Sequence, residues 1–158
     1  MTQRHMAHVQ GPVVTFLIGM RIRAFWRIWE WLPVMLAMPA MQRELAARKE
    51  LGLLGTRTYV SGRVILSVQY WQSFAQLEQY ARDPAHAHLP AWRKFNQRAR
   101  RSAGAVGIFH ETYTVGPGSV ESIYVDMPES FGLAGAVGQR GGSAAHPGAR
   151  ERLAAAAR

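Results

Sequence analysis

Hydrophobic and polar residues alternate along four stretches of the chain, and this alternation predicts four β-strands. The stretches are residues 13–22, 56–61, 64–71 and 106–115. The first is apolar at almost every position, which is typical of a strand that is covered on both faces. Gly62-Arg63 separates the second and third stretches by two residues, the spacing of a β-hairpin.

A long stretch after the first strand has the three- and four-residue spacing of a helix that buries one side. It ends near Arg48, and its apolar stripe consists of Trp31, Met35, Met38, Met41 and Leu45. Pro33 suits a first helical turn, whereas Pro39 is expected to kink or divide the helix because proline cannot donate a backbone hydrogen bond. We interpret the Trp and Met residues as core packing, with an adaptable ligand pocket as the alternative.

A second helix is predicted to begin after Ser73, because a serine followed three residues later by Gln76 forms a capping box. It stops before Asp83-Pro84, since the residue before a proline disfavours helical geometry. Pro90 can open a second piece of this helix.

The predicted order is strand, helix, strand, strand, helix in two pieces and strand, with one more strand at residues 120–127. This is the β-α-β-β-α-β plan of ferredoxin-like folds, an α+β class with an antiparallel sheet. The helices cover one sheet face, and because the other face is still apolar we predict a homodimer. We expect residues 1–10 to be a flexible leader and residues 11–134 the folded domain. The Gly-, Ala- and Arg-rich residues 135–158 are expected to be a basic tail that is disordered or weakly helical at residues 149–158.

Composition narrows the chemistry. The chain has 158 residues, which suits one domain, and no cysteine, which excludes disulfides, thiol catalysis and cysteine-bound metal clusters. His86 and His88 lie two apart in a loop without a nearby carboxylate or third histidine, so we expect no metal site. A formal charge of +9 invites a nucleic-acid hypothesis, but no recognised binding signature accompanies it, so we predict no nucleic-acid partner.

We find no stretch that predicts a membrane span. Crossing a bilayer takes roughly 20 apolar residues, and the apolar run at residues 13–20 is too short. The longer run at residues 25–41 is interrupted by Arg27, Glu30 and two prolines. We therefore expect a cytoplasmic protein without a membrane partner.

The strand at residues 106–115 carries the most direct chemical signal. Because side chains alternate between the faces of a strand, His110 lies on one face and Glu111 on the other, each among apolar or weakly polar neighbours. A titratable group in such surroundings needs a partner or a ligand. In the first strand, Arg21 interrupts an apolar face two positions after Gly19, where a missing side chain often leaves room for something that packs or binds.

Seven short phrases of the sequence carry a family resemblance. They are Phe16-Leu-Ile-Gly-Met-Arg21, Trp31-Leu-Pro, Gly52-Leu-Leu-Gly55, Gln69-Tyr-Trp71, His88-Leu-Pro-Ala-Trp92, Gly107-Ile-Phe-His-Glu-Thr-Tyr113 and Tyr124-Val-Asp-Met-Pro128. Together, over about residues 11–134, they resemble a family of uncharacterised domains described as similar to a monooxygenase of fumagillin biosynthesis. The resemblance implies a dimeric α+β barrel related to the antibiotic-biosynthesis monooxygenases.

By resemblance to cofactor-free monooxygenases of the barrel class, the chain is expected to bind a small hydrophobic or aromatic substrate between sheet and helices. The substrate's own carbanion then reacts with oxygen, and no cofactor is needed. His110 would act as the base, since histidine titrates near neutral pH, and Arg21 would stabilise the substrate anion. Glu111 would pair with an arginine at the dimer face. The residues expected to line the pocket are Met35, Tyr70, Trp92, Asn96 and Tyr124.

Three alternatives stay open. His110 could be a core histidine that is hydrogen-bonded to a neighbour. Some relatives resemble haem-dependent aldoxime dehydratases, which implies that His110 could be an axial haem ligand and that Arg21 or a helix arginine could pair with a propionate, although the sequence has no haem attachment motif. A barrel that binds a small ligand without catalysis is the third alternative.

Overall fold

The computed structural model of the protein describes residues 3–85, 90, 93, 97, 104–116, 118–141 and 148–156. The helices are α1 (Ile28–Ala47), α2 (Phe74–Arg82), α4 (Gly132–Val137) and α5 (Ala149–Ala156), with a short 3-10 helix η1 (Lys49–Leu51). The strands are β1 (Arg4–Ala7), β2 (Val13–Ile22), β3 (Leu53–Ser61), β4 (Val64–Trp71), β5 (Val106–Val115), β6 (Tyr124–Val125) and β7 (Gln139–Gly141).

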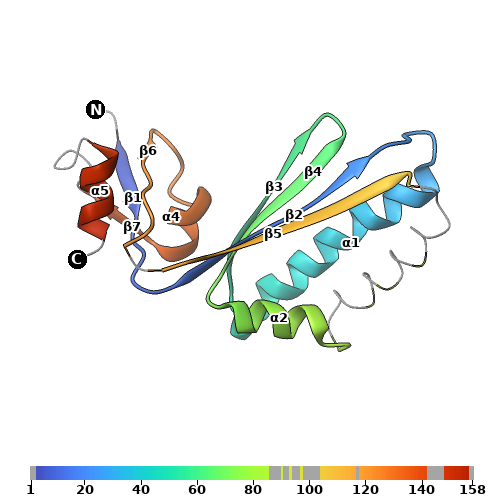
Figure 1. Cartoon of the computed structure of the whole chain (residues 1–158), viewed down its shortest axis with the longest axis horizontal. Coiled ribbons are helices and arrows are strands. Elements are labelled where there is room, and N and C mark those ends of the chain that lie inside the picture. The colour runs from blue at the N-terminus through green and yellow to red at the C-terminus, as the bar shows by residue number, and fades with distance from the viewer. Residues whose placement is uncertain are drawn as a thin grey trace.

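Four strands form the main antiparallel sheet, in the order β3-β4-β2-β5. Both α1 and α2 lie against the same face of this sheet (Figure 1). The predicted α+β, ferredoxin-like fold is therefore confirmed. The bounds of β2, β4 and β5 agree with the predicted stretches, whereas β3 begins at Leu53, three residues before the predicted start.

Two groups of buried side chains fill the space between the main sheet and its helices. The first group is Val14, Leu45, Trp71, Leu77 and Tyr80, and the second is Met20, Ile22 and Val106. Each large apolar side chain that is fully buried contributes about 1.5–3 kcal/mol relative to exposure. The α1 stripe predicted from the sequence faces this core, since Leu45 belongs to the first group and Trp31 and Met35 pack against the second.

Helix α1 is one element of 20 residues with Pro33 and Pro39 both inside it. Of the two effects expected from Pro39, a kink or a division of the helix, division does not occur. A proline removes one backbone donor, but the turns that follow are held by burial of Met41 and Leu45 against the sheet. Helix α2 begins as predicted, because the Ser73 hydroxyl accepts a hydrogen bond of 3.2 Å from the Gln76 backbone N–H.

A smaller sheet, in the order β6-β1-β7, lies with α4 and α5 beyond one end of the main sheet (Figure 1). The added strand predicted at residues 120–127 is limited to β6, and it pairs with β1 rather than with the main sheet. Here β1 lies in the predicted leader and β7 in the predicted tail, which differs from both expectations, whereas α5 lies where a weakly helical segment was one of the two alternatives. Pairing between residues more than 100 positions apart leaves no signal in local composition.

The main sheet has a second face, opposite α1 and α2. It carries Leu17, Leu66, Val68, Phe109 and Tyr113, among others, as strand alternation requires. The segment around α4 covers one corner of it, where the Arg57 guanidinium lies 4.4 Å from the centre of the Phe131 ring. Elsewhere this face includes exposed aromatic rings, with Phe109 39% and Tyr113 51% exposed. We call it the open face.

Gly19 lies on the open face, and its missing side chain makes room for an aromatic ring. A Cβ atom at Gly19 would be 2.5 Å from Cε1 of Phe109 and 3.0 Å from the Ile65 carbonyl oxygen. Such contacts are far below van der Waals separation. The space that the sequence suggested for a ligand is therefore taken by Phe109, which pairs with Gly19 across β2 and β5.

We expect Gly19→Ala to lower the free energy of unfolding by about 1–3 kcal/mol, because the Phe109 ring must move while the Ile65 carbonyl is fixed in the sheet. Urea denaturation measures this. Gly107→Ala on β5 is the matched control, since no atom lies within 4 Å of its added Cβ, and it should stay within about 0.5 kcal/mol of the wild type. Equal stability of the two variants would contradict the proposed contact.

Candidate functional site

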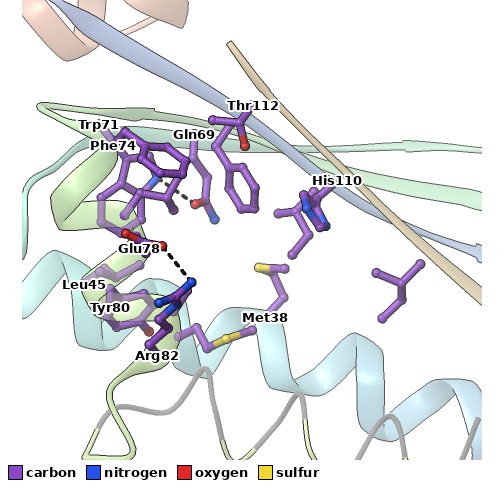
Figure 2. A pocket seen from close by; sticks show the side chains of 16 residues that line it. Met38, Leu45, Gln69, Trp71, Phe74, Glu78, Tyr80, Arg82, His110 and Thr112 are labelled. Atoms are coloured by element: carbon purple, nitrogen blue, oxygen red, sulfur yellow. Dashed lines mark hydrogen bonds and ion pairs between the residues drawn. The ribbon is translucent and has the colours of Figure 1, made fainter. Parts of the chain in front are cut away.

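A cavity of about 380 Å³ lies between the main sheet and helices α1 and α2 (Figure 2). The strands contribute Phe16, Ile18, Gln69, Trp71, Ile108, His110 and Thr112 to its wall. The helices contribute Met38, Met41, Leu45, Phe74, Leu77, Glu78, Tyr80, Ala81 and Arg82. Most of these side chains are apolar or aromatic, and a few are polar. This composition is typical of sites for small apolar ligands that are oriented by a few directional contacts.

His110 projects from β5 onto the wall of the cavity (Figure 2). In the sheet it pairs with Ile18 of β2, and its ring centre lies 5.8 Å from that of Phe16. Residue His110 is exposed, and the structure gives its imidazole no hydrogen bond to any described residue. The geometry is that of a side chain available to a ligand rather than one tied to a neighbour.

Gln69 is a polar side chain buried at the inner end of the cavity. It is 5% exposed and Trp71 is 1% exposed. The indole Nε1–H of Trp71 donates a hydrogen bond of 3.0 Å to Oε1 of Gln69 (Figure 2). An indole N–H can only donate, so the atom that it contacts must be the amide oxygen. This bond fixes the amide and leaves its NH₂ group, which has no partner among the described residues, as a donor at the cavity wall.

Tyr80 connects the two helices beside the cavity. Its hydroxyl, on α2, donates a hydrogen bond of 3.0 Å to Oε2 of Glu44 on α1. Burial, together with the nearby Glu44 carboxylate, raises the pKa of Tyr80 well above its usual range. The hydroxyl therefore stays protonated at neutral pH, and its role here is to hold α2 against α1.

An ion pair marks the rim of the cavity on α2. Nη2 of Arg82 lies 2.9 Å from Oε1 of Glu78, one helical turn earlier, and both side chains are well exposed (Figure 2). A pair of this kind contributes little to stability in water. It does place both signs of charge at the mouth of an otherwise apolar site.

The structure brings only part of the predicted site together. His110 lies on the cavity wall. Arg21 is exposed and points to the open face, because it is three positions from Ile18 in β2 and side chains alternate. Met35 packs against Met20, Ile22 and Val106 instead of lining the cavity. Trp92 and Asn96 lie outside the described residues.

Two tyrosines predicted to line the pocket lie away from the cavity. Tyr70 alternates with Gln69 and Trp71 in β4 and so faces the open side of the sheet. Burial, with smaller effects from Tyr124 and Tyr59, raises the pKa of Tyr70. Tyr124 belongs to the small sheet, where its ring stacks on His5 at 5.0 Å between centres.

Glu111 also lies on the open face, as alternation predicts. Its Oε2 accepts a hydrogen bond of 2.6 Å from the hydroxyl of Tyr113, two residues further along the same strand. This bond raises the pKa of Tyr113. Pairing of Glu111 with an arginine at a dimer face stays a prediction.

Sequence reasoning missed most of the cavity wall. Gln69 carried a usable signal, because it is an amide on the face of the strand that also holds Ile65 and Trp71. On α1, Met38, Met41 and Leu45 belong to the stripe for which a ligand pocket was the alternative interpretation. The residues from α2 carried no signal beyond helical spacing, since which turn lies over which strand depends on packing. Within the described part of the chain, no cluster of three or more His, Asp or Glu side chains could hold a metal ion, and no helix has the length and apolarity to cross a bilayer.

A protein-family model described as Monooxygenase af470-like matches residues 13–133. Over 93 residues the chain is 34% identical to Monooxygenase af470 of Aspergillus fumigatus. The aligned residues make up 55% of this chain and 32% of the fungal protein. The chain thus spans about a third of that relative's length.

Two solved structures are similar in fold. An aldoxime dehydratase, OxdRE in complex with butyraldoxime, has a TM-score of 0.70 at 14% identity, covering 85% of this chain and 40% of that one. SnoaB, a cofactor-independent oxygenase from Streptomyces nogalater, has a TM-score of 0.47 at 10% identity, covering 65% of this chain and 92% of that one. At such identities the first likeness shows the fold alone.

The raised pKa of Tyr80 predicts a change of stability in alkali. Because the folded state holds the Tyr80 proton more tightly than the unfolded state, this proton stabilises the fold fully below the unfolded tyrosine pKa of about 10. The stabilisation is lost as the pH rises above that value. At pH 8 we expect Tyr80→Phe to unfold about 0.5–1.5 kcal/mol more easily than the wild type. The difference should shrink above pH 10, as measured by urea denaturation at several pH values.

Tyr59→Phe, which removes an exposed hydroxyl, serves as the control and should match the wild type at pH 8. A Tyr80→Phe difference that stayed constant, or grew, above pH 10 would contradict the role assigned to the bond with Glu44.

Proposed function

The chain belongs to the Monooxygenase af470-like family, and we propose that it is a monooxygenase-like enzyme whose small hydrophobic or aromatic substrate binds between the main sheet and helices α1 and α2. The observation that carries this proposal is the free imidazole of His110 on the wall of an apolar cavity. The family supplies the reaction class, and the cavity supplies the substrate class. The chain spans about a third of its fungal relative. That this chain has a monooxygenase activity of its own is therefore part of the proposal.

His110 acts as the general base. It would remove a proton from an acidic C–H or O–H group of the substrate, and an apolar cavity strengthens this step by excluding water. The electron-rich anion that results can transfer electrons to O₂ and form the new carbon–oxygen bond. The imidazolium then gives its proton to the outer oxygen of the peroxide. Loss of the second C–H proton forms the carbonyl and breaks the O–O bond, and the departing hydroxide takes up this proton and leaves as water.

Gln69 stabilises the negative charge that develops. Its NH₂ group is the fixed donor at the cavity wall, so it suits a carbonyl oxygen that becomes an enolate oxygen. This is the role that the sequence assigned to Arg21. We transfer it to Gln69 because Arg21 points to the open face. The substrate class is therefore narrowed to apolar, flat molecules that carry one acceptor oxygen near an acidic C–H group.

The redox balance of such a reaction needs no cofactor. When a CH₂ group next to an aromatic ring becomes a carbonyl, the substrate loses four electrons and O₂ gains four. One oxygen atom stays in the product and the other leaves as water. The substrate is the reductant, so a site built from a base and a hydrogen-bond donor is chemically sufficient.

A haem enzyme similar to the aldoxime dehydratases is the second candidate, favoured by the fold likeness and by His110. The imidazole could serve as an axial ligand, and haem would supply iron chemistry. Its propionates would need cations, and the cationic lining residue that the structure describes, Arg82, is already paired with Glu78. The described lining thus fits the iron ligand better than the propionates, which is why we place this candidate second.

We also propose that two copies of the chain pair through their open faces. Leu17, Val68 and Phe109 form an apolar centre there, and Arg57 and Glu111 provide charges of both signs near it. An exposed apolar sheet face of this kind is costly in water and is a common site of self-association. The cavity lies on the opposite face, so pairing leaves it accessible.

The base is tested with anthrone, a tricyclic ketone with an acidic CH₂ group, as the probe. We expect oxygen uptake above the uncatalysed rate, with anthraquinone as product. His110→Ala should lower kcat about 10²- to 10⁴-fold. Gln69→Leu should lower kcat about 10²- to 10³-fold, the effect of removing one donor to a developing oxyanion. His8→Ala removes a histidine outside the cavity and should leave the rate unchanged.

Unchanged oxygen uptake in His110→Ala would exclude the base assignment. If the wild type gives no uptake with anthrone, an absorption spectrum after addition of haem decides between the two candidates. A Soret band that is lost in His110→Ala would favour the haem enzyme. A flat spectrum together with no uptake would favour a barrel that binds ligands without catalysis.

For the pairing of open faces, sedimentation equilibrium should give twice the mass of the chain. Phe109→Asp places a charge at the centre of the open face. It should raise the dissociation constant of the dimer at least about tenfold. Val125→Asp, an equally exposed apolar position on the small sheet, is the control. A wild type that sediments as a monomer at all concentrations would rule out this interface.

A further inference from the structure

Five apolar side chains stand exposed at the start of α1 and along its outer side. Their exposed fractions are 43% for Phe25, 73% for Trp26, 49% for Ile28, 70% for Trp29 and 59% for Leu36. We call them the α1 outer surface. Two tryptophans so fully exposed on one short segment are unusual, because tryptophan is on average highly buried.

The sequence of α1 explains why this surface exists. Between Trp31 and Met41 the helix has no charged residue, so it is apolar on every side. Its inner side faces the core and the cavity through Met41 and Leu45. A helix that is apolar all round is normally buried, within a protein or in a membrane. In the part of the chain that the structure describes, the outer side of α1 is therefore left uncovered.

The segment that presents the tryptophans is held in a defined position. The indole Nε1–H of Trp31 donates a hydrogen bond of 3.0 Å to the backbone carbonyl of Phe25, and the two rings meet edge to face. The guanidinium of Arg63, from the β3–β4 hairpin, lies 5.1 Å from the centre of the Phe25 ring. The outer surface is thus a built feature of the fold.

The charge around this surface has one sign. Between residues 21 and 43 the chain has four arginines, of which Arg21 points to the open face and does not belong to this surface, and one acidic residue. That residue, Glu30, is paired with Arg27, and its side chain is 12% exposed. Arg63 adds a further cation beside Phe25, where it also donates a hydrogen bond to the Arg23 carbonyl. Aromatic residues surrounded by arginines complement an anionic, partly apolar partner.

We propose that the α1 outer surface docks on an anionic lipid bilayer. Tryptophan side chains sit at the boundary between headgroups and acyl chains, and arginines attract anionic headgroups. The formal charge of +9 adds to this attraction. A protein that lies on a membrane needs no spanning segment, so the expectation of no membrane partner, which rested on the lack of a span, is revised.

Pairing of two copies through their open faces would leave the α1 outer surface uncovered, because the open face lies on the opposite side of the main sheet from α1 (Figure 1). Docking through α1 also has a consequence for ligands. The same helix contributes Met38, Met41 and Leu45 to the cavity wall, so the bilayer would lie against the element that borders the cavity. An apolar ligand dissolved in the membrane would then be concentrated next to the site.

The test is sedimentation of the full chain with vesicles of phosphatidylcholine, with and without about one third phosphatidylglycerol. We expect binding to the anionic vesicles, weakened at least about tenfold on neutral vesicles or in 1 M NaCl. Trp26→Ser/Trp29→Ser should weaken binding at least about tenfold, whereas Trp26→Phe/Trp29→Phe should retain most of it. Lipids brominated in the acyl chain should quench the tryptophan fluorescence of the wild type.

Leu153→Ser is the matched control, since it removes an exposed apolar side chain from α5 at the other end of the molecule and should bind like the wild type. Circular dichroism checks that each variant is folded. Failure of the folded wild type to bind anionic vesicles would overturn the proposal, and so would equal binding by Trp26→Ser/Trp29→Ser. If the tryptophan variant changes the mass in solution instead, the surface joins two copies of the chain and the membrane assignment is wrong.

Discussion

The register of the central strand β2 determines what this molecule can do. Strand β2 is paired along nearly its whole length, with Val14 opposite Trp71 on one side and Ile18 opposite His110 on the other. Side chains alternate between the two faces, so a slip of one residue would move every one of them to the other face. His110 and Gln69 reach the same cavity only because both neighbouring strands keep this register. The buried residues Val14, Met20 and Ile22 hold it in place.

The order of the elements along the chain and the bounds of β2, β4 and β5 followed from the sequence, because each of these strands is a run of apolar and β-branched residues. Alternation also placed His110 and Glu111 on opposite faces of the strand, but it did not indicate which of the two faces the helices cover. What did not follow was the content of the cavity. Arg21 and Tyr70 lie on the sheet face opposite the cavity. Alternation shows this only once the pairing of the strands is known, because only then can their faces be compared with that of His110. The small sheet was missed because β1 and β6 are far apart in sequence and short.

Helix α1 is apolar on both its inner and its outer side, and a single amphipathic pattern does not give this distribution. Its inner side supplies the apolar wall of the cavity, through Met38 and Met41, and its outer side is apolar too. In the sequence this appears as a weakly periodic run, interrupted by two prolines. A helix that only packed on a sheet would carry charges outward, as α2 does with Glu78 and Arg82. The weak periodicity of the α1 sequence therefore indicates an interaction made by the outer side of the helix, and it says little about the fold.

The cavity itself offers few directional groups, and this limits the chemistry that it can support. His110 can take a proton and Gln69 can donate one hydrogen bond, while Tyr80 is committed to Glu44 and stays neutral. Such a site cannot force an unreactive substrate to react by concentrating charge around it. It can deprotonate a molecule that is already acidic, hold the resulting anion away from water and leave room for O₂ beside it. Reactivity must then reside in the substrate, which is the situation in which an oxygenase can dispense with a cofactor.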